Sequence, residues 1–236
     1  MDTMNVLSFI QQAKRSGRKL LAILLDPEKV SMAHLSAYTE GADLLFVGGS
    51  TGSASEELMQ TLRSMTDKPL VLFPGQLSQL TCKADAVLFL SVLSSHNWEM
   101  LVGRQLAAAR QIKVGGLESI PMGYILIDGG NSSSVARESD SQPLAADDVE
   151  RIVDTAVTAE LLGKALIYLE AGSGARVPVS ETTIRAVRDM VNVPLIVGGG
   201  IRTPEQMQQA FRAGADIVVI GNHFEQHPEE VKKFRS

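Results

Sequence analysis

Eight short apolar runs alternate with amphipathic stretches along the chain, and this alternation limits the possible folds more than any other feature. Each run is near-continuously hydrophobic, as expected of parallel strands that are covered on both faces. The runs lie at 20–26, 42–50, 69–75, 84–92, 122–130, 165–174, 194–200 and 215–222, with helical patterns between most of them at 56–65, 98–110, 147–162, 180–190 and 204–213. This order predicts an α/β fold, a TIM-type (β/α)₈ barrel.

The main rival is a doubly wound open sheet, which is disfavoured because no G-x-G-x-x-G follows the first apolar run. No linker or low-complexity segment divides the chain, so residues 1–236 are expected to form a single domain. The segment QLSQLTCK (76–83) is too short for a full crossover helix, so the third helix is predicted to be missing or reduced. Its loss would leave an apolar groove on the barrel wall; a short loop covered by a neighbouring chain is an equally good interpretation.

Capping residues support the helix predictions. Thr203 followed by Pro204 is typical of a helix start, and Gly214 stands where that helix would end. At the other end of the chain, an amphipathic helix with Val6, Leu7 and Ile10 on one face is expected rather than a cleaved leader, because no basic start, apolar run and small-residue cleavage site occur there.

Composition excludes several classes of protein. The net charge is −5 and the Lys and Arg residues are scattered, which argues against a nucleic-acid partner. No stretch has the roughly 20 unbroken apolar residues of a membrane span. Cys82 is the only cysteine, so an intrachain disulfide is impossible and a reducing, cytoplasmic location is expected.

Glycines close the last two apolar runs and predict a phosphate site. Gly199 and Gly200 end one run, and Gly221 and Asn222 end the next. Glycine lets the backbone approach an anion closely, and a following helix N-terminus adds favourable partial charge. The last two strand–helix loops are also where barrels of this type commonly bind phosphate. Ordinary turn glycines are the alternative interpretation.

Glu170 stands directly before another glycine-rich turn, Gly172 to Gly174. Strand alternation places Tyr168 and Glu170 on one face and Leu169 on the other, so Glu170 is predicted to point into the barrel. A bound phosphorylated polyol would put a hydroxyl against this carboxylate, which would accept its proton as general base. The alternatives are a carboxylate bound to neighbouring loops and, for Tyr168, either a hydroxyl donor to the ligand or a core aromatic.

An acidic residue also ends the first run. Asp26 shares a face with Ala22 and Leu24, and Ser50 ends the second run. Hard oxygen ligands of this kind suit Mg²⁺, which keeps several waters and bridges phosphate oxygens. Asp26 as a helix N-cap and Ser50 as a plain turn residue are the competing interpretations.

Six motifs then occur in order along nearly the whole chain: LLDPEK (24–29), FVGGST (46–51), GYILIDGG (123–130), YLEAGSGA (168–175), VGGGIR (197–202) and IGN (220–222). Together they resemble the geranylgeranylglyceryl phosphate synthase family, which includes the bacterial heptaprenylglyceryl phosphate synthases. YLEAGSG is the most specific of them. GYILIDGG and the Ser-rich stretch after it look closer to the archaeal-like, geranylgeranyl branch.

The resemblance implies a TIM-like barrel without a regular third helix and Mg²⁺-dependent transfer of a prenyl group from its diphosphate to the C3 hydroxyl of sn-glycerol 1-phosphate. It implies a Mg²⁺ site at Asp26 and Ser50 and a catalytic base at Glu170. The implied glycerol phosphate site comprises Tyr168, Leu169, Glu170, Ala171, Gly172, Ser173, Gly174, Gly199, Gly200, Gly221 and Asn222. The branch also implies a homo-oligomer, a dimer or hexamer. One departure is His96, where the family pattern has a basic residue, Arg.

Two other functions are compatible with part of this pattern. A phosphosugar isomerase-type barrel explains VGGG and IGN but leaves Asp26 without a task. A barrel that binds a phosphorylated ligand without chemistry would explain His96. The separate Asp26 and Glu170 positions favour the transferase.

Overall fold

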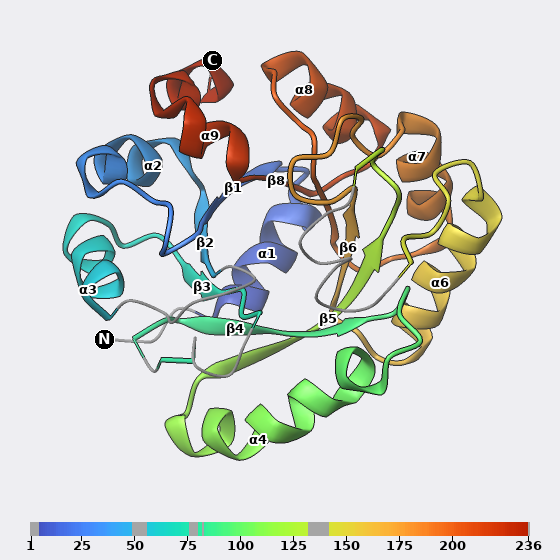
Figure 1. The fold of residues 1–236 in the computed structure, drawn as a ribbon, viewed down its shortest axis with the longest axis horizontal. Coiled ribbons are helices and arrows are strands. Elements are labelled where there is room, and N and C mark those ends of the chain that lie inside the picture. The colour runs from blue at the N-terminus through green and yellow to red at the C-terminus, as the bar shows by residue number, and fades with distance from the viewer. Residues whose placement is uncertain (1–4, 49–55, 76–79, 82, 132–141, 236) are drawn as a thin grey trace.

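The structure is a computed structural model that describes residues 5–48, 56–75, 80–81, 83–131 and 142–235. Its centre is a closed barrel in which every strand is parallel to its two neighbours and the last strand pairs with the first (Figure 1). The strands are β1 (Leu20–Leu25), β2 (Leu44–Val47), β3 (Leu70–Leu72), β4 (Ala86–Val92), β5 (Glu118–Leu126), β6 (Leu166–Glu170), β7 (Leu195–Gly198) and β8 (Ile217–Ile220). The predicted α/β barrel is confirmed.

Helices lie around the outside of this barrel, except α1, which lies behind it in Figure 1. The α-helices are α1 (Val6–Arg15), α2 (Leu35–Gly41), α3 (Glu56–Met65), α4 (Arg104–Gly115), α6 (Val149–Leu161), α7 (Glu181–Met190), α8 (Pro204–Ala213) and α9 (Asn222–Gln226). Two 3₁₀ segments, η1 (Met32–His34) and η4 (Pro228–Arg235), and one π-helical segment, η3 (Glu99–Gly103), accompany them. The predicted cap is present, since the Thr203 side chain accepts a hydrogen bond from the Gln206 N–H and Gly214 has φ 122°. The short helices α2 and α9 have too few turns to show a period in the sequence.

The connection from β3 to β4 differs from the others. None of its described residues, 73–75, 80–81 and 83–85, is helical, whereas 76–79 and 82 lie outside the described part of the chain. Within that limit the segment agrees with the predicted loss of the third helix. The fourth strand then pairs with β5 along its full length, from Ala86 opposite Glu118 to Val92 opposite Tyr124. This pairing starts β5 earlier than the predicted Met122.

Strand alternation divides the apolar side chains into two cores. Residues such as Ala22, Phe46 and Tyr168 fill the inside of the barrel, and residues such as Ile167 and Leu169 pack outward against the helices. Each strand therefore buries both faces, which is why the runs in the sequence are continuously apolar. Among the described residues, no helix is both long and apolar enough to span a bilayer.

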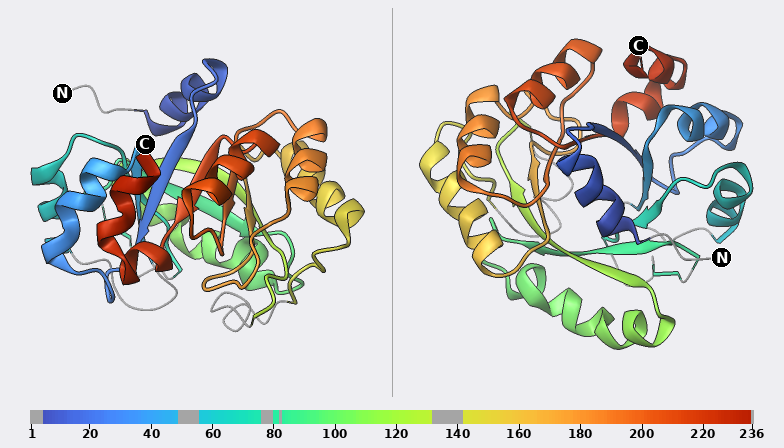
Figure 2. Two further views of the ribbon diagram at one scale, coloured as in Figure 1. Left: turned by 90° about the horizontal axis from the view of Figure 1, so that it is seen from above. Right: turned by 180° about the vertical axis from the view of Figure 1, so that it is seen from behind.

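The amino end of the barrel is closed by α1, which crosses it in the view from behind (Figure 2). Val6 and Ile10 join the inner core, as predicted from the amphipathic pattern, and Leu7 packs against it half-buried. The first N–H groups of a helix lack partners within it, and here Glu118 accepts from Val6 N at 2.7 Å and from Leu7 N at 3.0 Å. With this end closed, a ligand site belongs at the opposite, carboxyl end of the strands.

Candidate active site

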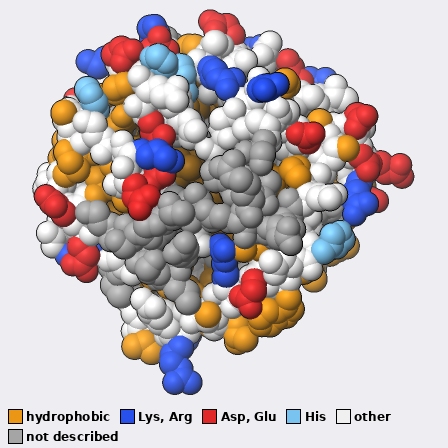
Figure 3. All heavy atoms as spheres, viewed as in Figure 1, with side chains coloured by type: hydrophobic (Ala, Val, Ile, Leu, Met, Phe, Trp, Pro, Cys, Tyr) orange, Lys and Arg blue, Asp and Glu red, His pale blue; other side chains and the backbone are white. Residues whose placement is uncertain are grey.

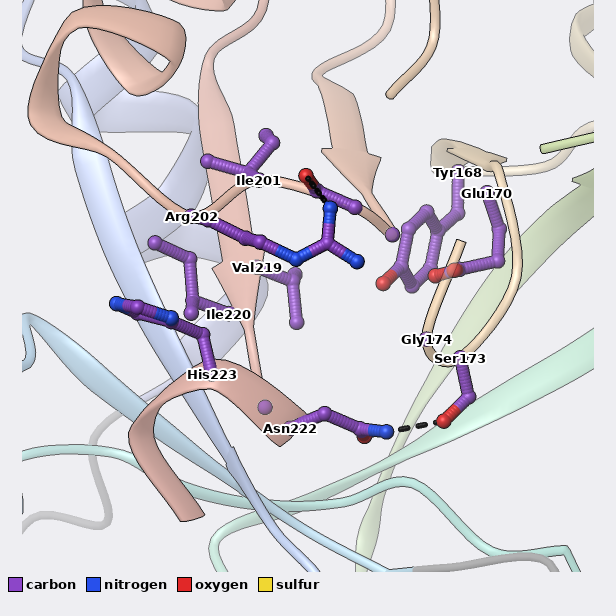
Figure 4. Close-up of a pocket in the computed structure, with 13 residues that line it drawn as sticks. Tyr168, Glu170, Ser173, Gly174, Ile201, Arg202, Val219, Ile220, Asn222 and His223 are labelled. Atoms are coloured by element: carbon purple, nitrogen blue, oxygen red, sulfur yellow. Dashed lines mark hydrogen bonds between the residues drawn. The ribbon is translucent and has the colours of Figure 1, made fainter. Parts of the chain in front are cut away.

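A pocket opens at the carboxyl ends of β6, β7 and β8 and at the start of α9 (Figure 4). It brings together residues that are far apart in the sequence, because the carboxyl ends of parallel strands meet on one face. The residues that line it are Tyr168, Glu170, Ser173, Gly174, Gly199, Gly200, Ile201, Arg202, Val219, Ile220, Gly221, Asn222 and His223. Both glycine turns that the sequence indicated therefore contribute to one cavity.

Backbone conformation explains why glycines form these turns. Gly172, Gly174, Gly199 and Gly200 all have positive φ, between 73° and 99°, where side chains are strained. At Gly199 a Cβ would also overlap the carboxylate of Glu170 and lie 2.8 Å from the Gly172 nitrogen. The backbone at Gly199 thus comes close to Glu170 only because it carries no side chain.

Glu170 ends β6 and points into the pocket, as strand alternation predicted (Figure 4). Its Oε1 accepts the N–H of Gly172 at 2.7 Å, and it accepts a further hydrogen bond from Tyr168. Burial raises the pKa of Glu170, and the hydrogen bonds from Tyr168 and Gly172 oppose that rise. A buried carboxyl with a raised pKa is a better proton acceptor than an exposed one, provided that it is ionised.

Tyr168 lines the same pocket with its ring in the inner core. Its ring lies 5.3 Å from that of Tyr124 and 5.8 Å from that of Phe73 between ring centroids. Burial, and then the charge of Glu170, raises the pKa of Tyr168 well above its ordinary value. Tyr168 therefore keeps its proton and donates a hydrogen bond to Glu170, while Tyr124 and Phe73 fix the ring in place.

Two loops that the sequence linked to phosphate are joined directly. The Ser173 hydroxyl donates to Oδ1 of Asn222 at 3.0 Å, and Nδ2 of Asn131 donates to the Ser173 carbonyl at 3.1 Å. Three residues of the predicted glycerol phosphate site do not line the pocket: the Leu169 side chain packs in the outer core, Ala171 is buried in the same core, and Gly172 supplies its N–H to Glu170.

Sequence reasoning assigned no role to two charged or titratable residues of this pocket, Arg202 and His223. Arg202 follows the glycine turn after β7, and its guanidinium donates to the carbonyls of Ala175 at 2.6 Å and Gly200 at 3.3 Å. Figure 4 shows it extending across the pocket toward Tyr168. The signal available was position alone, since Arg202 ends the motif VGGGIR and His223 directly follows IGN.

Asp26 lies at the end of the inward-facing row of β1, after Ala22 and Leu24. It is buried, its Oδ2 lies 2.6 Å from the Lys29 ammonium, and its Oδ1 accepts the Glu28 N–H at 3.1 Å. The hydrogen bond to Asp26 is the main cause that raises the pKa of Lys29. Asp26 is not among the residues that line the pocket described above. Figure 3 shows acidic and basic side chains side by side near the centre of this face.

Of the two predicted metal ligands, only Asp26 lies among the described residues. Asp26 already holds a cationic group, the Lys29 ammonium, so its position suits a positive charge. Ser50, the other predicted ligand, lies outside the described residues. Within the described ranges, no group of three or more His, Cys, Asp or Glu side chains is placed to hold a metal. The described residues therefore offer no closed shell of protein ligands of the kind that structural Zn²⁺ needs, whereas Mg²⁺ can be held by one or two carboxylates and keeps several waters.

Comparison with known proteins shows similarity along most of the chain. Residues 14–235 match the PcrB family. A protein of Zunongwangia profunda named geranylgeranylglyceryl phosphate synthase is 46% identical over 93% of this chain and 97% of its own length. A protein of the same name from Korarchaeum cryptofilum is 37% identical over 97% of both chains.

A solved structure extends the likeness to the fold. It is (S)-3-O-geranylgeranylglyceryl phosphate synthase from Thermoplasma acidophilum, crystallised in complex with its substrate sn-glycerol-1-phosphate. The two structures have a TM-score of 0.89 and 34% sequence identity, covering 98% of this chain and 97% of the other.

Proposed function

Since the chain belongs to the PcrB family, we propose that it is a prenyltransferase that joins a geranylgeranyl group to the C3 hydroxyl of sn-glycerol 1-phosphate, giving an ether lipid precursor and diphosphate. The observation that carries this proposal is Glu170, buried and turned into a pocket rimmed by glycines. The similar enzyme from Thermoplasma acidophilum, whose structure contains sn-glycerol-1-phosphate, supports the same ligand here.

The glycine turns and Glu170 divide the work on the acceptor. Gly199, Gly200 and Gly221, with Asn222, offer backbone N–H groups and a polar side chain to the phosphate. The phosphate end then lies against these residues, and the C3 hydroxyl lies against Glu170. Glu170 takes the hydroxyl proton as the oxygen forms its bond to carbon one of the prenyl group, and the bond from that carbon to the diphosphate breaks.

Asp26 and Ser50 are proposed to hold the Mg²⁺ ion. When bound, Mg²⁺ neutralises charge on the diphosphate as it leaves. The Lys29 ammonium, 2.6 Å from Oδ2 of Asp26, would help to hold this carboxylate in place. The metal is thus proposed to bind at the ends of the early strands, and the monophosphate at the ends of the late ones.

Removing the metal is expected to stop the reaction. EDTA should lower product formation at least roughly tenfold, with recovery on added Mg²⁺, and Asp26→Asn should lower Mg²⁺ affinity by at least a similar factor. Magnesium titration by calorimetry, followed by a product assay, measures both effects. Asp189→Asn, on the exposed end of α7, is the control and should bind Mg²⁺ as the wild type does. Full activity in EDTA would disprove the metal requirement.

The prenyl tail is proposed to lie along the barrel wall beside β3 and β4. There the described residues of the connection form no covering helix. Burying a C20 chain stabilises the complex by about 0.8 kcal/mol per CH₂ before ordering costs. A donor-length series, from farnesyl to heptaprenyl diphosphate, measures which chain length the protein prefers.

The reaction itself is tested with radiolabelled sn-glycerol 1-phosphate and geranylgeranyl diphosphate, with and without EDTA. An organic-extractable product that disappears in EDTA supports the transferase. A water-soluble isomer of the phosphorylated substrate supports an isomerase. Binding without any product supports a barrel that only holds a phosphorylated ligand.

An apolar stripe on one side supports the proposed homo-oligomer. Trp98 at the N-cap of η3, Val102 within η3 and Leu106 within α4 are spaced four residues apart and are 54%, 46% and 68% exposed. Figure 3 shows hydrophobic side chains gathered at the lower edge of the molecule, where α4 lies in Figure 1. Exposed apolar stripes of this kind mark contact surfaces.

A cytoplasmic location is proposed separately, because the chain has a single cysteine.

Trp98→Asp is expected to shift the protein to a smaller assembly, because a charge replaces the largest apolar side chain of the stripe. Light scattering after gel filtration measures the mass. Leu161→Asp is the matched control, since Leu161 is exposed at the end of α6, away from the stripe, and this variant should keep the wild-type mass. A wild-type monomer would exclude the oligomer.

A further inference from the structure

His223 lines the pocket from the first turn of α9, directly after Asn222. Its side chain is only 12% exposed, and its Nε2 lies 3.0 Å from Oε2 of Glu230. Glu230 belongs to η4 and does not line the pocket, so Nε2 is directed away from the cavity lining. Among the described residues, the other ring nitrogen, Nδ1, has no hydrogen-bond partner.

The groups around the ring hold it in this position. Its centroid lies 5.7 Å from that of Phe224, 5.9 Å from that of Phe234 and 5.3 Å from that of His227, which itself faces Glu229. These contacts come from α9 and η4, so the C-terminal segment determines the ring orientation. Of these rings, only that of His223 belongs to the pocket lining.

Glu230 accepts a hydrogen bond from this ring. Its Oε1 lies 2.8 Å from the Lys233 ammonium, and its Oε2 faces His223. The Lys233 hydrogen bond is the main cause that lowers the pKa of Glu230, and His223 adds to it. Glu230 therefore stays ionised and accepts the Nε2–H. With the proton on Nε2, a neutral imidazole has only a lone pair at Nδ1.

A phosphate bound beside Nδ1 would meet a lone pair there unless the ring gains a proton. A phosphate monoester carries about −1.5 to −2 charge at neutral pH, and its oxygens accept hydrogen bonds. Glu170 adds a carboxylate to the same cavity, and within the described lining Arg202 is the only other cationic side chain. A lone pair at Nδ1 would repel the phosphate, whereas an N–H there would donate to it and balance its charge.

We propose that His223 is a phosphate-binding residue of this pocket. Its ring takes up a proton from solvent when sn-glycerol 1-phosphate binds, and Glu230 holds the ring in position. This inference rests on the proposed function, because it takes the same ligand. It adds one cation to the site at the moment of binding, and it connects the C-terminal segment to ligand recognition.

Calorimetry without prenyl donor tests the proposal. Binding of sn-glycerol 1-phosphate is measured at about pH 7.5, where the ester is mostly dianionic because its second pKa is about 6. Two buffers of different ionisation enthalpy reveal protons taken up. The wild type should take up a net fraction of a proton. His223→Gln should abolish the uptake and weaken binding roughly tenfold, as expected for the loss of one charge-assisted hydrogen bond.

Matched variants separate His223 from its neighbours. His227→Gln changes the adjacent imidazole, which does not line the pocket, and should keep both uptake and affinity. Glu170→Gln removes the carboxylate of the cavity and should keep the uptake. Glu230→Gln leaves the pocket lining intact and should reduce the uptake, and it carries the test if His223→Gln does not fold.

Each result has one meaning. No proton uptake by a wild type that binds the ligand overturns the inference and leaves the proposed function standing. Uptake that persists in His223→Gln, or that disappears in Glu170→Gln, overturns it in the same way. A folded wild type that does not bind sn-glycerol 1-phosphate overturns the proposed function and this inference together.

Discussion

Glu170→Gln is expected to lower turnover by roughly 10²–10⁴ and to leave the affinity for sn-glycerol 1-phosphate almost unchanged. The amide has the same shape, so its oxygen still accepts the Gly172 N–H that Oε1 accepts at 2.7 Å. It cannot take the proton of the attacking hydroxyl. Steady-state rates with both substrates, together with calorimetric binding of the acceptor, measure the two effects separately.

The pH dependence of the reaction rate and of stability tests the same assignment. Burial raises the pKa of Glu170, so the ionised base is lost as pH falls through that raised value. The wild-type rate should therefore begin to fall at a higher pH than it would with an ordinary carboxyl. For unfolding, the folded protein binds the extra proton, so this group destabilises the fold as pH rises through the same window. Glu170→Gln should therefore be at least as stable as wild type at neutral pH.

Two outcomes would contradict the assignment of Glu170. Unchanged turnover in Glu170→Gln would remove its role as base. A loss of turnover accompanied by a large loss of thermal stability would make its role structural. Glu181→Gln, an exposed carboxyl in the first turn of α7, is the control and should match wild type in both measurements.

Gly199→Ala is expected to abolish activity and to destabilise the fold by roughly 1–3 kcal/mol, a typical cost of a strained backbone position. Gly199 has φ 80°, and a Cβ there would overlap the Glu170 carboxylate and lie 2.9 Å from the Ala171 nitrogen. The methyl group must push Glu170 away from its position or shift the turn. Turnover and the free energy of unfolding in denaturant measure the two effects.

Gly116→Ala separates backbone strain from collision. Gly116 follows α4 with φ 67°, and a Cβ there would meet nothing within 4 Å. This variant should lose about 1 kcal/mol of stability for the left-handed conformation and keep its turnover. If Gly199→Ala keeps activity as Gly116→Ala does, Glu170 does not depend on the close approach at Gly199.

The fold follows from sequence to a large extent, because burial on both faces leaves a clear pattern. Continuous apolar runs such as 195–198 and 217–220 are buried strands here, as this pattern predicts. The elements that escaped prediction are short or are set by distant partners. The start of β5 depends on pairing with β4, and α9 has a single turn.

The site was predictable where periodicity or glycine chemistry applies. Alternation along β6 is enough to turn Glu170 inward and Leu169 outward. Arg202 and His223 come after the strands end, where no period applies, so only the folded loops show that they face one cavity. The Asp26–Lys29 pair is local in sequence, but its place on the barrel face depends on the whole fold.

The carboxylate of Glu118 also has a consequence for how the chain is made. Its partners, the N–H groups of Val6 and Leu7, precede it by 112 and 111 residues. At a synthesis rate of about 5–20 residues per second, roughly 6–22 s pass between the synthesis of this helix and that of Glu118. During that time the apolar side of this helix has no barrel to cover, and a chaperone that shields newborn chains would find its binding surface there.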